Sequence, residues 1–358
     1  MLFPRGWAAE IAQASWGDRL DRIRTQHDLP GLAAALVGPT GVTSLAVTGV
    51  RKKAASEPIT PQDEWHLGSN TKAMTATLAA LAVQEKKLRW DSTLGQVFPR
   101  QKDLQKSPLV AATLTHLLSH WSGLPANAMW GLFGLSGKND LRAQRASVLE
   151  LAARTSDLPQ PGSRHEYSNW GYVLAGHMLE TVWDASWEEL MQRRLFQPLG
   201  IQRAGFGGLG TPGQNDQPWP HNGKGEPMPN NGPLVDNPAV LGPAGTVHLA
   251  MQDWGRFIAE HLAGRAGKGR LLSSQAAYEH LHTATQPPEP YAYGWISLER
   301  KWGGRVLHHG GSNTMNHSVA WLAPEKGFAV IACTNSGSEK APLALDQAAS
   351  LLIQQHQA

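Results

Sequence analysis

Ser69 and Lys72 stand at the start of a long apolar segment, residues 73–83, which predicts a buried helix. A residue three positions on lies one turn away on the same helix face, so the lysine amine can reach the serine hydroxyl. Burial lowers the pKa of an ammonium group towards the range of a general base. Free N–H groups at a helix start also favour a developing oxyanion. The spacing therefore suits acyl transfer by a serine nucleophile with a lysine base.

A serine and a lysine at this spacing also arise by chance, as a helix N-cap followed by a surface lysine. A second element, Tyr167-Ser168-Asn169, precedes a helix predicted to begin near Gly171. In an extended loop alternate side chains point the same way, so Tyr167 and Asn169 can face one cleft. The phenol can relay a proton if a neighbouring cation lowers its pKa, and Asn169 can bind a substrate carbonyl. A half-buried aromatic residue and a helix N-cap are the alternatives that stay open.

The third element is His309-Gly310-Gly311-Ser312, at the end of a predicted apolar strand. Glycines there let a substrate backbone lie close to the sheet edge. The N–H of Ser312 can complete an oxyanion hole with that of Ser69. The alternative is a glycine turn beside an incidental histidine, since the chain has 15 histidines.

Strands from both ends of the chain and helices from its middle must hold these three elements. Apolar runs predict strands over 32–37, 42–47, 306–309, 318–322 and 328–334, and helices over 72–85, 113–119, 147–154, 171–182 and 187–195. The stretch 206–244 is rich in Gly, Pro and Asn, which predicts irregular backbone that wraps a site or joins two lobes.

The pattern predicts an α/β (α+β) fold with one antiparallel sheet, flanked by terminal helices, and an inserted, mainly helical domain. We expect a discontinuous sheet domain from residues 1–88 and 240–358, a helical domain from 89–239, and an active-site cleft between them.

The order and separation of the three elements resemble the superfamily of serine β-lactamases, penicillin-binding proteins and family VIII carboxylesterases, particularly its class C-like branch. Stretches 65–94, 114–125, 161–180, 195–207, 243–257 and 307–336 also look like that family, so the resemblance covers nearly the whole chain. It implies a β-lactamase/transpeptidase-like fold. By the same resemblance Ser69 is the acylated nucleophile, Lys72 its base and Tyr167 the proton relay.

The resemblance further implies substrate contacts from Asn169, His309 and Gly311, and an oxyanion hole from the backbone of Ser69 and Ser312. His309 stands where the family's lactamases and peptidases usually have lysine. An imidazole with an ordinary pKa near 6.5 is often neutral at pH 7, which disfavours a substrate carboxylate. We therefore expect an esterase or amidase, with a D-amino-acid peptidase (DD-carboxypeptidase), a β-lactamase or a penicillin-binding sensor without turnover as alternatives.

Composition excludes several other classes. The formal net charge of the chain is only +3, and its lysines and arginines are scattered along the sequence. We therefore expect no nucleic-acid partner. The single cysteine, Cys333, lies in an apolar run typical of a buried strand and can form no internal disulfide. No stretch approaches the roughly 18 to 20 apolar residues of a membrane span. We expect a soluble protein, either cytoplasmic or exported with a signal peptide that this chain lacks.

We also expect neither a cofactor nor a metal. His116 and His120 have a spacing that can hold a metal on a helix, but no third ligand accompanies them. We interpret them as a helix-packing pair. The expected partner is a small ester, amide or peptide substrate.

Overall fold

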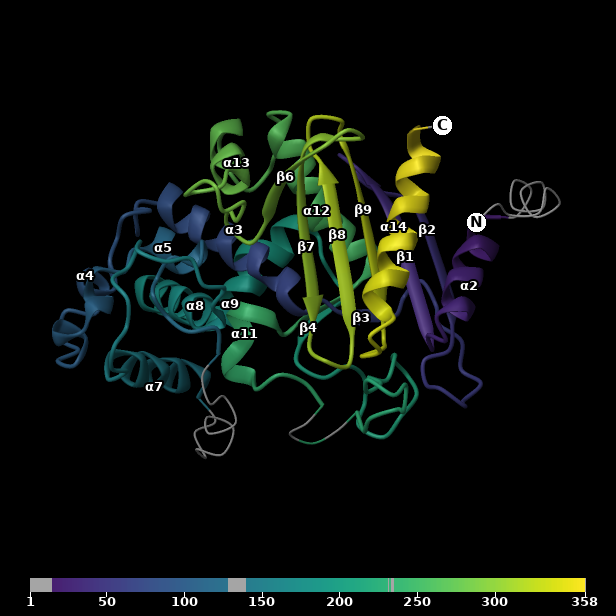
Figure 1. Cartoon of the computed structure of the whole chain (residues 1–358), viewed down its shortest axis with the longest axis horizontal. Helices are drawn as coiled ribbons and strands as arrows, with labels where there is room; N and C mark the ends of the chain where they lie inside the picture. Colours follow the sequence, from purple (N-terminus) through teal and green to yellow (C-terminus); the bar gives the residue numbers. More distant parts are fainter. Residues whose placement is uncertain (1–14, 128–139, 231, 233–234, 358) are drawn as a thin grey trace.

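A six-stranded antiparallel sheet is assembled from the two ends of the chain in the computed structural model, which describes residues 15–127, 140–230, 232 and 235–357 (Figure 1). Its order is β2-β1-β9-β8-β7-β6. The strands are β1 (Gly31–Gly38), β2 (Gly41–Gly49), β6 (Ile296–Arg300), β7 (Gly304–Ser312), β8 (His317–Ala323) and β9 (Phe328–Thr334). The five predicted strands are confirmed, and the first two form the antiparallel pair β1 and β2, while β6 was not predicted.

The two faces of the sheet bury different helices. Strand β1 alternates, so Leu32 and Ala34 pack with α2 (Trp16–Gln26) and α14 (Ala341–Gln357) on one face. Figure 1 shows these two helices side by side over that face, as expected for flanking terminal helices. The opposite face packs on α12 (Met251–Arg265) and the helices beyond it. Cys333 is fully buried in β9, as predicted.

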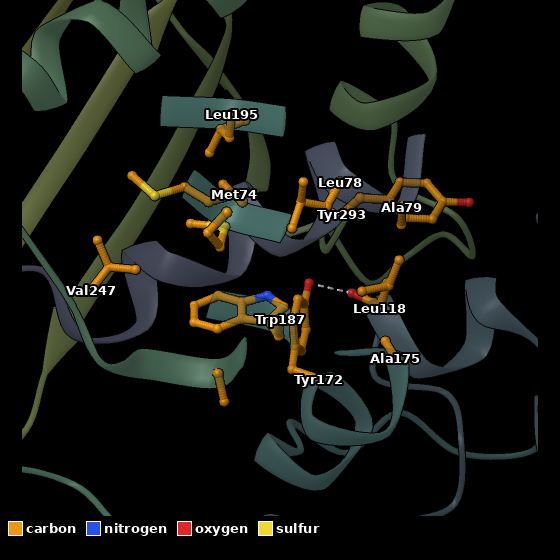
Figure 2. Packing of buried hydrophobic residues seen from close by; sticks show 14 of the residues in the cluster. Met74, Leu78, Ala79, Leu118, Tyr172, Ala175, Trp187, Leu195, Val247 and Tyr293 are labelled. Atoms are coloured by element: carbon orange, nitrogen blue, oxygen red, sulfur yellow. Dashed lines mark hydrogen bonds between the residues drawn. The ribbon is translucent and has the colours of Figure 1, made fainter. Parts of the chain in front are cut away.

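Helix α3 (Thr71–Gln84) runs through the centre of the helical part. Figure 2 shows Met74 and Leu78 of this helix packed near Trp187, Tyr172 and Leu195. The Tyr172 hydroxyl donates to the carbonyl oxygen of Leu118 at 2.6 Å. The surrounding elements are α5 (Leu114–Leu118), α7 (Leu141–Ala153), α8 (Asn169–Trp183), α9 (Trp187–Leu190) and a π-helical turn (Met191–Phe196). Each predicted helix is thus present, with α7 beginning earlier than predicted and the last one divided into α9 and the π-turn.

A buried ion pair joins three of these helices. The Arg145 guanidinium of α7 lies 2.5 Å from a carboxylate oxygen of Glu180 on α8 and 2.6 Å from one of Glu188 on α9. The Arg145 and Glu180 side chains are both fully buried, so each charge depends on the other.

A second, three-stranded sheet lies at the junction of the two parts. Its order is β3 (Glu64–His66), β5 (Val247–Ala250) and β4 (Ala204–Phe206). Strand β4 belongs to the predicted helical domain and pairs with β5 of the predicted sheet domain, so pairing crosses that boundary. The domain limits at residues 88 and 240 stay a prediction. The described residues of 207–238 contain no helix or sheet strand, in line with the irregular stretch that was predicted.

Shorter elements complete the described structure. They are α4 (Leu94–Val97), α10 (Gln197–Leu199), α11 (Gly242–Gly245), α13 (Gln275–His282) and single 3-10 turns at Gly68–Asn70, Leu104–Lys106, Pro108–Ala111 and Ala239–Leu241. No helix in the described part of the chain is long and apolar enough to cross a membrane.

Candidate active site

Ser69 sits in the 3-10 turn that joins β3 to α3. The preceding Gly68 has φ +50°, a conformation that favours glycine, and a Cβ there would overlap with the backbone nitrogen of Ser312. Asn70 donates to the Ser318 hydroxyl at 2.8 Å, and that hydroxyl donates to the Leu67 carbonyl at 2.7 Å. The turn that presents Ser69 is therefore held directly against the ends of β7 and β8.

Lys72 lies one turn along α3 and is fully buried. Its Nζ is 2.9 Å from Ser69 Oγ, 2.7 Å from Asn169 Oδ1 and 2.8 Å from the carbonyl oxygen of Ala244. Burial lowers the pKa of this amine well below its usual value. The alternative of a surface lysine is therefore wrong for Lys72.

The three contacts also fix the direction of the Lys72 lone pair. A neutral amine has two hydrogens, and both Asn169 Oδ1 and the Ala244 carbonyl can only accept. When these two oxygens take the hydrogens, the lone pair is left for the hydroxyl of Ser69. This geometry suits a neutral lysine that accepts the proton of Ser69, and the predicted role of Lys72 as base stays a prediction.

Asn169 is the first residue of α8, and the N-cap of that helix is Ser168, whose hydroxyl accepts from Gly171 N. The side-chain carbonyl of Asn169 accepts from Lys72, while its Nδ2 donates to Asn127 Oδ1 at 2.8 Å. The N-cap alternative is therefore wrong for Asn169. Its predicted contact with the substrate stays a prediction.

Tyr167 is half-buried beside the same lysine. Its ring centre lies 4.9 Å from Lys72 Nζ. Burial raises the pKa of the phenol, and the Ser69 side chain offsets only part of that effect. The prediction that a neighbouring cation lowers the pKa of Tyr167 is therefore wrong. Burial favours the neutral amine of Lys72, so the lysine does not act as that cation. A neutral phenol is a proton donor.

His309 of β7 lies beneath the site with only 3% of its surface exposed. Its Nδ1 is 2.6 Å from the Gly310 carbonyl oxygen, which can only accept, so Nδ1 carries the proton. Nε2 then accepts from the Tyr291 hydroxyl at 3.0 Å. Burial is the main cause that lowers the pKa of His309 to about 3. The position thus lacks a permanent charge, as expected, and a direct substrate contact stays a prediction.

Gly311 and Ser312 close the site from the sheet. Strand β6 pairs with β7 as far as His308, and the register with β8 continues to Ser312. A Cβ on Gly311 would overlap with the carbonyl oxygen of Leu67. The two predicted oxyanion donors, the N–H groups of Ser69 and Ser312, therefore belong to segments in direct contact. Their joint action on a substrate, like the contact predicted for Gly311, stays a prediction.

His120 was missed as part of the site. Helix α5 ends at Leu118, and His120 follows it with φ +67°, so it is not a helix-packing partner of His116. Its Nδ1 accepts from the backbone N–H of Ser168 at 3.0 Å, and its ring centre lies 4.2 Å from that of Tyr167. The nearby glycine turn at Gly123 was the only signal in the sequence. Tyr291 and Ala244 carry no signal of their own.

Within the described residues no group of three or more His, Cys, Asp or Glu side chains is arranged to hold a metal. His116 Nδ1 instead accepts from the backbone N–H of Thr113 at 3.3 Å.

The sheet, the central helix and the Ser69–Lys72 pair together define a β-lactamase/transpeptidase-like protein. The model of the Beta-lactamase family matches residues 12–355, and the chain belongs to this family. Its members are serine hydrolases of the β-lactamase and penicillin-binding-protein type, which confirms the resemblance predicted from the three motifs.

Known relatives cover most of the chain. Penicillin-binding protein 4 of Amycolatopsis lactamdurans is 28% identical over 348 residues, covering 90% of this chain and 85% of that protein. Protein flp of Staphylococcus aureus (strain MW2) is 24% identical over 331 residues, covering 88% of this chain but only 63% of that protein. The crystal structure of D-alanine carboxypeptidase AmpC from Burkholderia cenocepacia has a TM-score of 0.75 at 19% identity, covering 95% of this chain and 97% of that one. This last similarity confirms the fold alone.

Proposed function

We propose that the protein is a serine hydrolase that forms an acyl-enzyme on Ser69 and acts on esters or amides. The observation that carries the proposal is the buried Lys72 amine, whose Nζ lies 2.7 Å from Asn169 Oδ1, 2.8 Å from the Ala244 carbonyl oxygen and 2.9 Å from Ser69 Oγ. A lysine on the surface would be protonated at neutral pH and unable to act as a base.

In the acylation step Ser69 Oγ forms a bond to the acyl carbon while its proton passes to Lys72. The carbonyl oxygen takes the negative charge and accepts hydrogen bonds from the N–H groups of Ser69 and Ser312. The bond to the leaving alcohol or amine then breaks, and Tyr167 relays a proton to that group. Water completes the cycle by attacking the acyl-enzyme.

The substrate class is inferred from charge. His309 is neutral and buried, with both ring nitrogens bonded to Tyr291 and Gly310. It therefore offers no cation to a substrate carboxylate, which favours neutral esters and amides over a β-lactam or a D-alanyl-D-alanine end. In this proposal Asn169 and Gly311 contact the acyl part of the substrate, and His309 forms part of the wall of the site. No cofactor takes part in any step.

A D-amino-acid peptidase or β-lactamase is the second candidate, favoured by the relatives. The first relative described above is a penicillin-binding protein, and the solved structure is that of a D-alanine carboxypeptidase. Release of D-alanine from a peptidoglycan peptide, or hydrolysis of a β-lactam, at a rate above that of any ester would favour this candidate.

The test compares turnover of p-nitrophenyl butyrate by wild type, Ser69→Ala and Ser273→Ala, the last an exposed serine remote from the site in sequence. We expect turnover by wild type and S273A and none by S69A. Unchanged turnover by S69A would disprove the assignment of the nucleophile. A stable acyl adduct on the intact protein, seen by mass spectrometry without release of product acid, would instead support a sensor without turnover.

A further inference from the structure

Asp236 is a buried carboxylate in the irregular stretch between β4 and the turn at Ala239–Leu241. Its side chain is only 3% exposed. One oxygen, Oδ1, lies 2.8 Å from His66 Nε2 and 2.8 Å from Asn313 Nδ2. A buried carboxylate is costly unless polar partners compensate it, so the hydrogen bond from Asn313 and the close polar contact with His66 stabilise its position.

The first contact leads to the nucleophile. His66 is the last residue of β3 and is 2% exposed. Its Nδ1 accepts from the backbone N–H of Gly68 at 3.1 Å, so the ring proton lies on Nε2, towards Asp236. Gly68 directly precedes Ser69. The carboxylate therefore holds the segment that carries the first predicted oxyanion donor.

The second contact leads to the sheet. Asn313 directly follows Ser312, the last residue of β7. While Nδ2 of Asn313 donates to Asp236, its Oδ1 accepts from the backbone N–H groups of Met315 at 3.2 Å and Asn316 at 2.9 Å. The carboxylate thus also holds the turn that carries the second predicted oxyanion donor.

Asn237, the residue after Asp236, connects the same segment to Lys72, the predicted base. Asn237 donates to the carbonyl oxygen of Gly245 at 3.0 Å. Gly245 follows Ala244, whose carbonyl accepts from Lys72. The consecutive residues Asp236 and Asn237 therefore contact the segments that hold the nucleophile, the predicted oxyanion hole and the predicted base.

We propose that Asp236 is a positioning residue that sets the separation between the backbone N–H groups of Ser69 and Ser312. The inference rests on the proposed function, because an oxyanion hole matters only to an acyl-transfer enzyme. Stabilisation of an oxyanion requires both donors at hydrogen-bond distance, and displacements of about 1 Å can cost about 100-fold in rate. Without the carboxylate, His66 and Asn313 lose the group that both of them contact, and the two segments are no longer tied together.

The second oxygen of Asp236 supplies a conservative variant. Oδ2 is buried and has no hydrogen-bond partner among the described residues. In Asp236→Asn the amide nitrogen can occupy that place while the remaining oxygen keeps the hydrogen bond from Asn313 and the contact with His66. Asp236→Ala removes both. Asp216, an exposed carboxylate of the same irregular stretch, gives Asp216→Ala as the matched control.

The test measures the rate at which a fluorophosphonate probe labels the full chain. Labelling forms a bond between Ser69 Oγ and phosphorus and breaks the P–F bond, with fluoride leaving and the serine proton passing to Lys72. It needs the same donors for the phosphoryl oxygen. We expect D236A to react at least about tenfold more slowly than wild type, D236N to recover most of the rate, and D216A to match wild type.

The controls separate this inference from the proposed function. Absence of labelling in wild type, or equal labelling of S69A, would overturn the proposed function. Labelling of D236A at the wild-type rate would overturn only the role of Asp236. On p-nitrophenyl butyrate we expect kcat to fall in D236A with KM little changed; a lower thermal midpoint with unchanged kcat would show a merely structural role. If D236A does not fold, Asn313→Ala removes the same hydrogen bond from the other side. Labelling of this variant at the wild-type rate would then overturn the inference.

Discussion

The carbonyl oxygen of Leu67 lies directly against Gly311, so closely that a Cβ on the glycine would overlap with it. The turn that carries Ser69 begins at the residue after Leu67, and Ser312 directly follows Gly311. The absence of a side chain at Gly311 therefore lets the nucleophile turn and β7 meet. Gly310, its neighbour, has no atom within 4 Å of the position its Cβ would take.

We predict opposite outcomes for the two glycines. Gly311→Ala must push β7 away from the Ser69 turn and separate the oxyanion donors, so the acylation rate should fall about 100-fold or more. Gly310→Ala places its methyl group in open space and should keep the rate within about threefold, with stability changed by less than about 0.5 kcal/mol. Pre-steady-state acylation and urea unfolding measure the two effects. Equal rates for the two variants would contradict the close contact.

His120 should act through the Ser168 backbone. In His120→Leu that N–H, which the ring nitrogen accepts at 3.0 Å, is left buried without an acceptor. The loss of stability should be about 1–3 kcal/mol. Asparagine tolerates the left-handed backbone of this position, and its side-chain oxygen can take the place of Nδ1, so His120→Asn should recover much of the loss. Urea unfolding of both variants measures this. A leucine variant as stable as the asparagine variant would argue against the hydrogen bond.

Lys72 should give a characteristic dependence of stability on pH. Burial lowers its folded-state pKa well below 10.5, whereas the unfolded chain keeps the ordinary value. Between the two pKa values the unfolded state binds one more proton than the folded state. The free energy of unfolding therefore rises with pH in this window, by about 1.4 kcal/mol per pH unit, and the penalty vanishes above the unfolded pKa.

Lys72→Met removes this contribution while the groups remote from Lys72 titrate alike in both proteins. The stability of wild type relative to K72M should rise as the pH increases towards 10, measured by urea unfolding at a series of pH values. A difference that does not vary with pH would mean that the lysine keeps its charge in the folded protein. The same titration should appear in kcat/KM, which must rise with pH through the folded pKa of Lys72, because the neutral amine is the base.

The residues of the site were predictable where a short stretch of sequence fixes the relative positions of their side chains. Ser69 and Lys72 are one helical turn apart, and the apolar residues after them indicate burial. Tyr167 and Asn169 lie two residues apart, on either side of Ser168, the N-cap of α8. The sheet was predictable for the same reason, because its apolar strands are continuous in sequence.

The remaining contacts join residues that are distant in the sequence. Ala244 and Asp236 reach the site through irregular backbone, where no periodicity marks their role. Strand β6 escaped prediction because its residues are only half-buried or exposed and form no apolar run. His120 was assigned to a helix that in fact ends at Leu118, because four-residue spacing alone cannot locate a helix end.

The two arginines of helix α7 provide a last prediction with a built-in control. Arg145 pairs with Glu180 and both side chains are fully buried, whereas Arg142 pairs with Asp184, whose side chain is 90% exposed. Arg145→Ala leaves a buried carboxylate without its partner and should cost about 3–5 kcal/mol. Arg142→Ala loses a surface pair screened by water and should cost less than about 1 kcal/mol. Urea unfolding of the two variants measures the loss in the free energy of unfolding. Similar losses would mean that the buried ion pair does not hold the helices together.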